Sequence, residues 1–136
     1  MCGITGWLYL PGAEPAITVL DRMAASIRHR GPDDKGEYHE PADGIALAHR
    51  RLSIIDLSDA SHQPMEDTER KIALVYNGEL YNFRELRREL QGRGHGFRSA
   101  GDTEVVLRSF IEWGVGAFER FKGMFALALW DGASQT

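Results

Sequence analysis

The spacing of apolar residues predicts that the first half of the chain consists of short strands around one helix. Residues 4–10 form an apolar, β-capable run that ends at a Pro-Gly turn. Between residues 15 and 27, apolar positions recur at helical spacing, which predicts a helix. This helix ends before Pro32, because proline pushes the preceding residue out of the helical region. Short extended segments are expected at 36–39, 45–49 and 52–55, followed by a polar loop over 56–70.

The second half is expected to contain two helices between two strands. Residues 72–76 form a compact β-type run that stops at an Asn-Gly pair, and residues 124–130 form a final buried strand that enters a hairpin-type turn. Asn82, with Glu85 three residues later, resembles a capping box at the start of the first helix. Glycines at 92, 94 and 96 end it, a brief strand over 97–99 follows, and the second helix runs from Asp102 or Thr103 to Gly114.

Apolar residues line one face of each expected helix: Phe83, Leu86 and Leu90 on the first, and Val106, Leu107, Phe110 and Ile111 on the second. Strands occur in pairs and helices are interspersed irregularly, which does not fit a simple βαβ alternation. The pattern therefore indicates an α+β protein with antiparallel or mixed sheets covered by helices.

Composition narrows the class of protein. The 136 residues, of which 43% are hydrophobic, carry a net charge of -4, as expected for one globular domain. No apolar run approaches the ~20 residues of a membrane span, and no basic region precedes the first apolar residues as in a secretory signal. The 20 acidic residues outnumber the 16 basic ones, which argues against a nucleic-acid surface. We therefore expect neither a membrane nor a nucleic-acid partner.

The single cysteine, Cys2, is the first candidate for chemistry. One cysteine excludes an intrachain disulfide framework and a multi-cysteine zinc site, so a reducing, cytoplasmic location is the default. If Met1 is removed, Cys2 carries both a thiol and a free α-amine. With a reference pKa of ~7.7–8.0, that amine is a suitable base for activating the thiol beside it. The alternative is an accidental small residue at a frayed chain end.

Several further motifs accompany Cys2 along the chain. They are His-Arg-Gly-Pro-Asp at 29–33, Ala-His-Arg-Arg-Leu-Ser-Ile-Ile-Asp at 48–56, Tyr-Asn-Gly-Glu-Leu-Tyr-Asn at 76–82, Gly-Asp-Thr-Glu at 101–104 and Gly-Met-Phe-Ala at 123–126. In this order they resemble the glutaminase domain of class II glutamine amidotransferases, the N-terminal nucleophile type. Within that group the chain is most similar to the N-terminal half of glutamine-hydrolysing asparagine synthetase.

The resemblance implies a four-layer αββα sandwich of the N-terminal nucleophile hydrolase type, which hydrolyses L-glutamine to glutamate and ammonia. It implies that residues 1–136 are one glutaminase domain, incomplete at its C-terminal end. It further implies a synthetase domain that would follow and receive the ammonia, and we expect that domain to be absent from these 136 residues. No cofactor or metal is implied for this domain, and ATP and Mg are expected only for the synthetase domain.

The resemblance also implies roles at the reacting amide. Cys2 matches the nucleophile, and Asn77 and Gly78 match the oxyanion hole, where a side-chain amide and a backbone N–H are suitable donors. Without the resemblance, Asn-Gly after a strand is an ordinary type I′ turn. The 29–33 loop receives no chemical step and is interpreted as a structural loop near Cys2.

The remaining matches concern the charged groups of an amino acid. Arg51 matches the group that grips the α-carboxylate, which suits its two parallel N–H donors. Glu79 and Asp102 match the acceptors of the α-ammonium. The alternatives are a solvated arginine, a surface acid and a helix N-cap, respectively. The segment that frames the bound substrate matches Leu52, Ser53, Ile54 and Ile55. The alternative for the apolar side chains of Leu52, Ile54 and Ile55 is a place in the core.

Other functions stay open at this point. The same glutaminase could serve another ammonia acceptor, such as a sugar, a β-lactam precursor or an exopolysaccharide. A non-catalytic module for ligand sensing or protein contact could also retain the fold. The sequence leaves a homodimer open as well.

Overall fold

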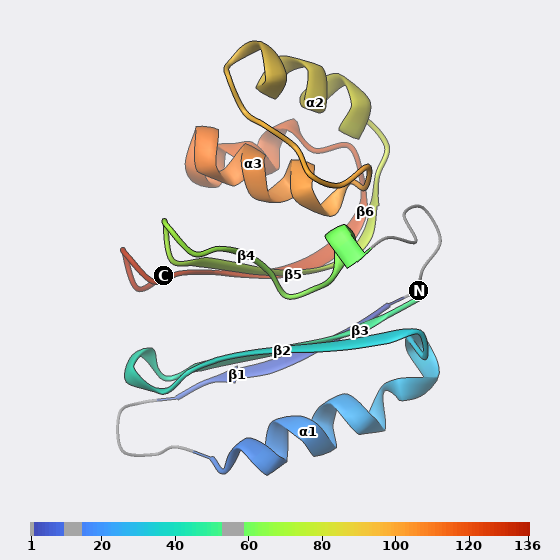
Figure 1. Ribbon diagram of the computed structural model, residues 1–136, viewed down its shortest axis with the longest axis vertical. Helices are drawn as coiled ribbons and strands as arrows, with labels where there is room; N and C mark the ends of the chain where they lie inside the picture. The colour runs from blue at the N-terminus through green and yellow to red at the C-terminus, as the bar shows by residue number, and fades with distance from the viewer. Residues whose placement is uncertain (1, 10–14, 53–58) are drawn as a thin grey trace.

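The computed structural model describes residues 2–9, 15–52 and 59–136, which form four layers. Two three-stranded sheets face each other, and helices cover both outer faces (Figure 1). This arrangement confirms the predicted αββα sandwich. In chain order the elements are β1 Gly3–Leu8, α1 Ile17–Ser26, β2 Asp34–Glu40, β3 Ile45–Arg51, β4 Met65–Asp67, β5 Ile72–Leu80, α2 Phe83–Gly92, α3 Thr103–Trp113 and β6 Gly123–Asp131.

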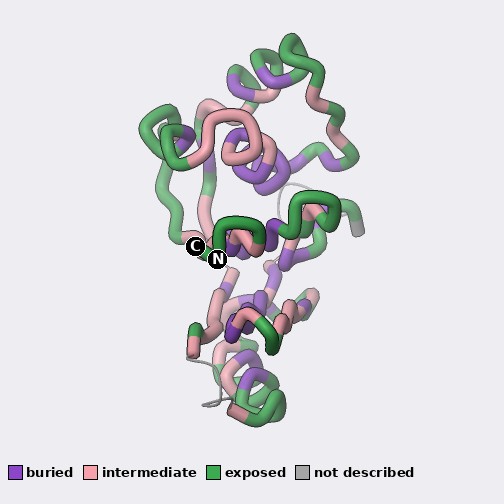
Figure 2. The backbone as a smooth tube through the Cα atoms, turned by 90° about the vertical axis from the view of Figure 1, so that its left-hand side faces the viewer, coloured by how far each residue is buried: buried purple, intermediate pink, exposed green. Residues whose placement is uncertain are grey.

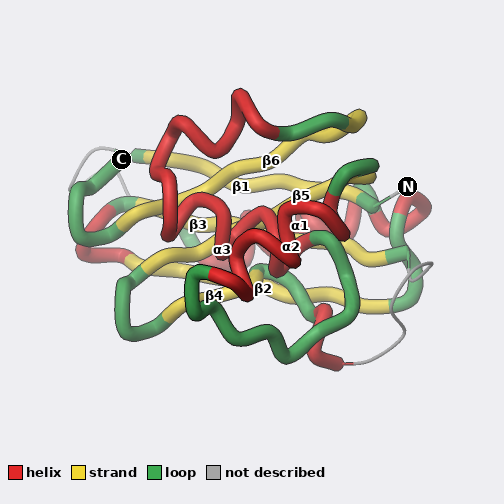
Figure 3. The backbone as a smooth tube through the Cα atoms, turned by 90° about the horizontal axis from the view of Figure 1, so that it is seen from above, coloured by secondary structure: helices red, strands yellow, loops and turns green. Residues whose placement is uncertain are grey.

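Both sheets are antiparallel, with β3 and β5 as their central strands. The first sheet has the order β1-β3-β2 and is covered by α1, and the second has the order β4-β5-β6 and is covered by α2 and α3. A short helical segment, Gly114–Arg120, leads from α3 to the start of β6 (Figure 3). The register sets the start of β1 beside the end of β3, and the end of β5 beside the start of β6.

The central strands are apolar on both faces because each lies between two layers. Alternate residues of a strand point to opposite faces. Ile45 and Leu47 of β3 therefore pack against Val75 of β5, between the sheets. The intervening alanines of β3 pack against Leu20 and Ala24 of α1, with Trp7 beside them. Figure 2 shows the buried positions concentrated along these strands and the inner sides of the helices.

The largest cluster lies between the second sheet and its helices. Each fully buried leucine in it contributes about 1.5–3 kcal/mol relative to an exposed one. All seven apolar residues predicted to line the two helix faces belong to this cluster or pack against it. Its buried residues are Ile72, Leu74, Tyr76, Leu80, Leu86, Leu90, Val105, Val106 and Leu107.

His49 connects the two sheets. Its side chain is only 1% exposed, and its Nε2 donates a hydrogen bond to the Tyr76 carbonyl oxygen at 3.1 Å. A carbonyl can only accept, which fixes the proton of the neutral ring on Nε2. Burial lowers the pKa of His49 to about 4. The ring is therefore neutral near pH 7 and can make this bond without a buried charge.

The structure corrects three predictions of secondary structure. Strand β4, Met65–Asp67, lies within the expected 56–70 loop, where it pairs with β5 over three residues. Strand β5 does not stop at the Asn-Gly pair but continues to Leu80, because β6 pairs with it as far as Leu80↔Gly123. Residues 97–99 form no strand. Of the expected 52–55 segment, only Leu52 belongs to the described part, where it follows β3.

The predicted capping box is wrong as well. Asn82 is the N-cap residue of α2, but its side chain makes no capping hydrogen bond. Its amide instead bonds the segment before β6, donating to the Arg120 carbonyl at 3.0 Å and accepting from the Lys122 N–H at 3.0 Å. The Asn82 side chain therefore makes long-range hydrogen bonds in place of a local helix cap.

The expected turn after β6 is present. The Asp131 N–H donates to the Thr136 carbonyl at 2.8 Å, and the Gly132 N–H donates to the Lys71 carbonyl at 2.9 Å. Across the described residues, each helix is too short or too polar to cross a bilayer.

The buried His49 predicts how stability depends on pH. In the unfolded chain, the His49 side chain takes up a proton near pH 6.5, whereas in the folded protein it does so only near pH 4. Stability is therefore retained above pH 6.5 and falls as the pH drops toward 4, by about 3 kcal/mol from this group. Urea unfolding of wild type and His49→Gln at pH 7 and pH 4.5 measures the difference, which should shrink in the variant.

The exposed His29 provides the matched control, because His29→Gln should leave the pH dependence of the wild type in place. An unchanged pH dependence in His49→Gln would contradict the buried, neutral histidine.

Candidate active site

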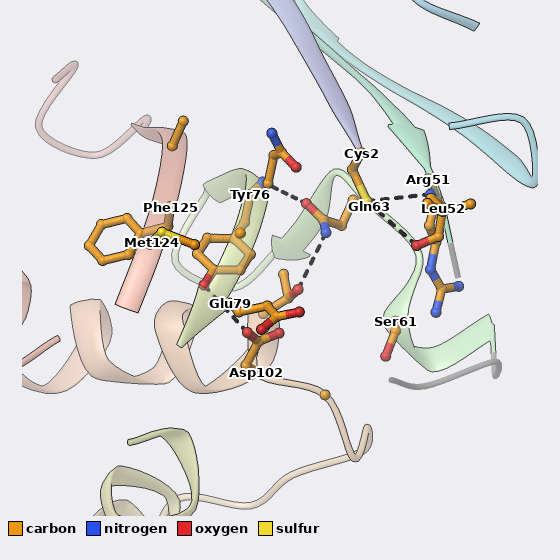
Figure 4. Close-up of a pocket in the computed structure, with 15 residues that line it drawn as sticks. Cys2, Arg51, Leu52, Ser61, Gln63, Tyr76, Glu79, Asp102, Met124 and Phe125 are labelled. Carbon is orange, nitrogen blue, oxygen red and sulfur yellow. Dashed lines mark hydrogen bonds between the residues drawn. The ribbon is translucent and has the colours of Figure 1, made fainter. Parts of the chain in front are cut away.

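A cavity of about 670 Å³ opens where the ends of the two sheets meet (Figure 4). The start of β1, the ends of β3 and β5, the start of β6 and the loop before α3 all contribute to it. The cavity therefore brings together segments that are far apart in sequence. Its lining residues are Cys2, Arg51, Leu52, Ser61, Gln63, Tyr76, Asn77, Gly78, Glu79, Gly101, Asp102, Thr103, Met124, Phe125 and Ala126.

Most of the residues singled out from the sequence meet in this cavity. They are Cys2, Arg51, Leu52, Asn77, Gly78, Glu79 and Asp102. Ser53, Ile54 and Ile55 lie outside the described residues. The convergence supports the predicted grouping, while the role of each residue stays a prediction.

Cys2 is held both at its side chain and at its backbone carbonyl. Its Sγ lies 3.4 Å from the backbone N–H of Leu52, which donates to it, and 3.7 Å from the Leu52 carbonyl oxygen. The Arg30 Nε–H donates to the carbonyl oxygen of Cys2 at 3.1 Å. The predicted interpretation of the 29–33 loop as a structural element near Cys2 fits this contact. These bonds orient the free thiol at the wall of the cavity.

Asn77 and Gly78 lie within strand β5 and not in a turn, so the interpretation as a type I′ turn is wrong. The N–H of Tyr76 points away from β6, since it donates to Oε1 of Gln63 at 2.6 Å. Alternate residues of an antiparallel strand direct their N–H groups to the same side. The N–H of Gly78 therefore also points away from β6, and Gly78 lines the cavity.

Only glycine fits at position 78. A Cβ there would lie 2.4 Å from the carbonyl oxygen of Met124 and 2.5 Å from Cα of Phe125 on the neighbouring strand. The close approach of β6 thus accounts for the glycine in the Asn-Gly pair. The absence of a side chain also leaves its N–H accessible from the cavity.

Asp102 presents a buried carboxylate to the same cavity. It is 6% exposed, and its Oδ2 accepts from the Leu80 N–H at 2.9 Å and the Tyr76 hydroxyl at 3.4 Å. Both donors are neutral, and burial raises the pKa of the carboxyl group. It stands at the N-cap position of α3 but makes no capping hydrogen bond, because the carboxylate is directed at β5 instead. A bound cation would stabilise its charge.

Arg51 and Glu79 differ in their surroundings. Arg51 ends β3 and is only 8% exposed, so it is not the solvated strand arginine of the alternative interpretation. Glu79 is exposed at the rim of the cavity, opposite Met124 in the strand register. The cavity therefore has a buried cationic and a buried anionic side chain, with an additional carboxylate at its edge.

Sequence reasoning did not single out the side chains of Ser61, Gln63 and Tyr76. Gln63 is 5% exposed and bonds both β5 and the first residue of α3. The residues lie in the expected polar loop or among the apolar positions of a strand, so no local signal distinguishes them. Met124 and Phe125 belong to a motif that the sequence comparison used without assigning it a role, and they form an exposed apolar lip.

A metal site is not apparent in the described part of the chain, where no three His, Cys, Asp or Glu side chains gather as a metal would require. The polar groups in the cavity suit a small molecule with charges of both signs.

Comparison with known proteins gives consistent matches along the chain. The sequence pattern of a family described as "Glutamine amidotransferase domain" matches residues 1–136. Asparagine synthetase [glutamine-hydrolyzing] 3 of Bacillus subtilis (strain 168) is 41% identical over 137 residues, covering 96% of this chain and 21% of the relative. Amidase chry2 of Gibberella zeae is 34% identical over 143 residues, with 96% and 21% covered. The chain thus spans about a fifth of the length of these relatives.

Solved structures share the fold. Glutamine phosphoribosylpyrophosphate (PRPP) amidotransferase from B. subtilis superimposes with a TM-score of 0.55 at 23% identity, covering 65% of this chain and 21% of that one. A structure described as the allosteric regulatory enzyme of purine biosynthesis gives a TM-score of 0.52 at 23% identity, with 63% and 21% covered.

The contact between β5 and β6 predicts the effect of a methyl group at position 78. In Gly78→Ala the new Cβ would collide with backbone atoms of β6, so the strands must separate beside the cavity. Overpacking of this kind costs about 1–3 kcal/mol, which urea unfolding measures. In the control, Gly92→Ala at the end of α2, no atom beyond the adjacent residues and the backbone of the helix itself lies within 4 Å of the new Cβ, and stability should be unchanged or higher. Equal stability of the two variants would contradict the packing described.

Proposed function

Because the chain belongs to the glutamine amidotransferase domain family, we propose that it hydrolyses the side-chain amide of L-glutamine, with Cys2 as the nucleophile. The products are glutamate and ammonia. The observation that carries this proposal is the convergence of Cys2, the Asn77–Gly78 strand end and the buried Asp102 on one cavity. A module for ligand sensing would not require a thiol beside these groups.

The proposed mechanism requires that Met1 has been removed, which frees the α-amine of Cys2. The amine takes the Sγ proton, and the sulfur attacks the amide carbon of glutamine. The carbonyl oxygen becomes an oxyanion that accepts hydrogen bonds from the Asn77 side-chain amide and the Gly78 N–H. A preorganised donor of this kind contributes about 3 kcal/mol to transition-state stabilisation. Gly78 suits the role because its N–H is directed away from β6.

The tetrahedral intermediate collapses with cleavage of the carbon–nitrogen bond. The α-ammonium of Cys2 gives its proton to the departing nitrogen, which leaves as ammonia, and a thioester remains. Water then attacks the thioester carbon and loses a proton to the same amine. Cleavage of the carbon–sulfur bond releases glutamate and returns the thiol.

Recognition of glutamine depends on the two buried charges. Arg51 binds the α-carboxylate through its guanidinium fork, and Asp102 accepts the α-ammonium, assisted by Glu79 at the rim. The ammonium supplies the positive charge that the neutral donors to Asp102 lack. Leu52 and the following residues Ser53, Ile54 and Ile55 frame the bound amino acid.

In the whole protein, the released ammonia passes to an acceptor activated elsewhere. The asparagine synthetases among the relatives are about five times as long as this chain and carry the words "glutamine-hydrolyzing" in their names. We propose a following synthetase domain that binds ATP and Mg and forms asparagine, while this domain needs no cofactor. The similarity to an amidase is compatible with other acceptors of the ammonia. A free catalytic thiol fits a reducing, cytoplasmic setting.

Replacement of the nucleophile tests the reaction. Cys2→Ala should lower glutamine hydrolysis by on the order of 10³-fold or more, because no other group can form the thioester. The thermal midpoint should stay close to that of wild type, since Cys2 is half-buried and makes only weak sulfur contacts. Ammonia release by the variant at the wild-type rate would refute the proposed nucleophile.

Retention of Met1 is a separate test of the base. A peptide nitrogen at position 2 cannot accept the thiol proton, so protein that keeps Met1 should be nearly inactive. Intact-mass measurement paired with the glutaminase assay reports both properties on one sample. Full turnover by unprocessed protein would exclude the α-amine as the base.

Substitution of Arg51 tests substrate recognition. Arg51→Lys keeps the charge but loses the bidentate fork, so KM for glutamine should rise roughly 10- to 100-fold. The adjacent Arg50 is the matched control, because its Nε–H donates to the Ala24 carbonyl of α1 at 3.2 Å and lies outside the cavity lining. Arg50→Lys should leave KM unchanged. An unchanged KM in Arg51→Lys would assign the carboxylate to another group.

A further inference from the structure

We propose that Gln63 is a positioning residue, which sets the oxyanion donors on β5 at the correct place relative to Asp102. This inference rests on the proposed glutaminase function and adds a residue outside its reacting groups. Gln63 precedes Pro64 in the segment between η3, Asp59–Ser61, and β4, and its side chain points toward β5 and the start of α3 (Figure 4).

The side chain of Gln63 continues the hydrogen bonding of the sheet where β4 is absent. Strand β4 pairs with β5 only from Met65↔Leu74 to Asp67↔Ile72, so the next N–H on that side of β5, at Tyr76, has no backbone partner. Oε1 of Gln63 accepts from this N–H at 2.6 Å. A buried N–H without a partner costs free energy comparable to a lost hydrogen bond, so Gln63 fixes β5 one residue before Asn77.

The other end of the same amide reaches the opposite wall of the cavity. Nε2 of Gln63 donates to Oγ1 of Thr103 at 3.3 Å, and Thr103 is the first residue of α3, next to Asp102. One planar amide therefore joins the strand that carries Asn77 and Gly78 to the helix start that carries Asp102. The two halves of the substrate site share a rigid spacer.

Gln63 is itself held by the other sheet. A Cβ on Gly36 of β2 would lie 2.0 Å from the Gln63 carbonyl oxygen, so β2 and this backbone are in direct contact. The neighbouring His62 places Nδ1 2.6 Å from Oδ2 of Asp34, also on β2. The segment is thus fixed on the first sheet, while its glutamine side chain fixes the second sheet and α3.

The residue type suits this task. The amide accepts at one atom and donates at another, so it satisfies the Tyr76 N–H and the Thr103 hydroxyl at once. Methionine has a similar length and apolar character but can do neither. The Gln63→Met substitution therefore removes both bonds without opening a large cavity.

The experiment measures kcat and KM for glutamine in Gln63→Met, per active site counted by covalent labelling of Cys2. We expect kcat to fall roughly 10- to 100-fold, because two buried hydrogen bonds that align the oxyanion donors are lost, and KM to change much less. Alkylation of Cys2 by iodoacetamide needs no oxyanion hole and should keep its rate. Gln91→Met on the exposed face of α2 is the matched control and should keep the wild-type kcat.

Thr103→Val is the second variant and decides the question if Gln63→Met does not fold. It removes only the bond to Nε2, so kcat should fall by roughly two- to tenfold. A lower thermal midpoint with unchanged kcat in the folded variant would reduce Gln63 to a structural residue and overturn the inference alone. A processed wild type without glutaminase activity would overturn the proposed function and the inference with it.

Discussion

The structure depends most on how Tyr76 is held. Its backbone N–H donates to Gln63, its backbone carbonyl accepts from His49, and its side-chain hydroxyl donates to Asp102. These partners come from the segment before β4, from the centre of the first sheet and from the residue before α3. Both sheets and the helical layer therefore converge on one residue, immediately before Asn77 and Gly78. A displacement of any layer would therefore move Asn77 and Gly78, the proposed oxyanion donors.

The place of the cavity follows from the same constraint. Between the sheets, the central strands satisfy their backbone groups by pairing and bury apolar side chains on both faces. Strand β4 pairs with only part of β5. Beyond that part, the backbone groups of β5 need other partners, because buried polar groups are rarely left unpaired. Polar side chains supply them at this end of the sandwich. The protein thus gathers Gln63, Asp102 and the thiol of Cys2 where the regular ladder gives way to side-chain hydrogen bonds.

Burial also separates from the bulk solvent the two charges that we propose bind the amino acid. Arg51 and Asp102 are both nearly buried, and burial raises the pKa of the aspartate. Burying a charge is costly unless opposite charge or hydrogen bonds compensate it, and a zwitterion would bring both opposite signs to this cavity. An uncharged amide would bring neither charge, so the same arrangement should disfavour it.

Helical spacing and strand composition, which are local, predicted the helices and most of the strands, whereas the four-layer sandwich was implied only by the family resemblance. The motifs that contain Cys2, Arg51, Asn77 and Asp102 indicated which residues would meet. The exact end of β5 was not predictable, because the Asn-Gly pair is a turn signal and only pairing with the distant β6 overrides it. Asn82 was expected to cap a helix, and a helix N-cap was the alternative interpretation of Asp102, yet each side chain bonds another segment. Gln63 was missed because a glutamine in a polar loop carries no local sign of burial.

The most direct measurement of the central claim is the covalent intermediate itself. Met-processed protein is mixed with glutamine, quenched in acid within the first turnover and analysed by intact mass and peptide mapping. We expect a mass increase of one glutamyl group, located on Cys2 and absent before mixing. Release of ammonia with no adduct at Cys2, or with an adduct on another residue, would contradict it.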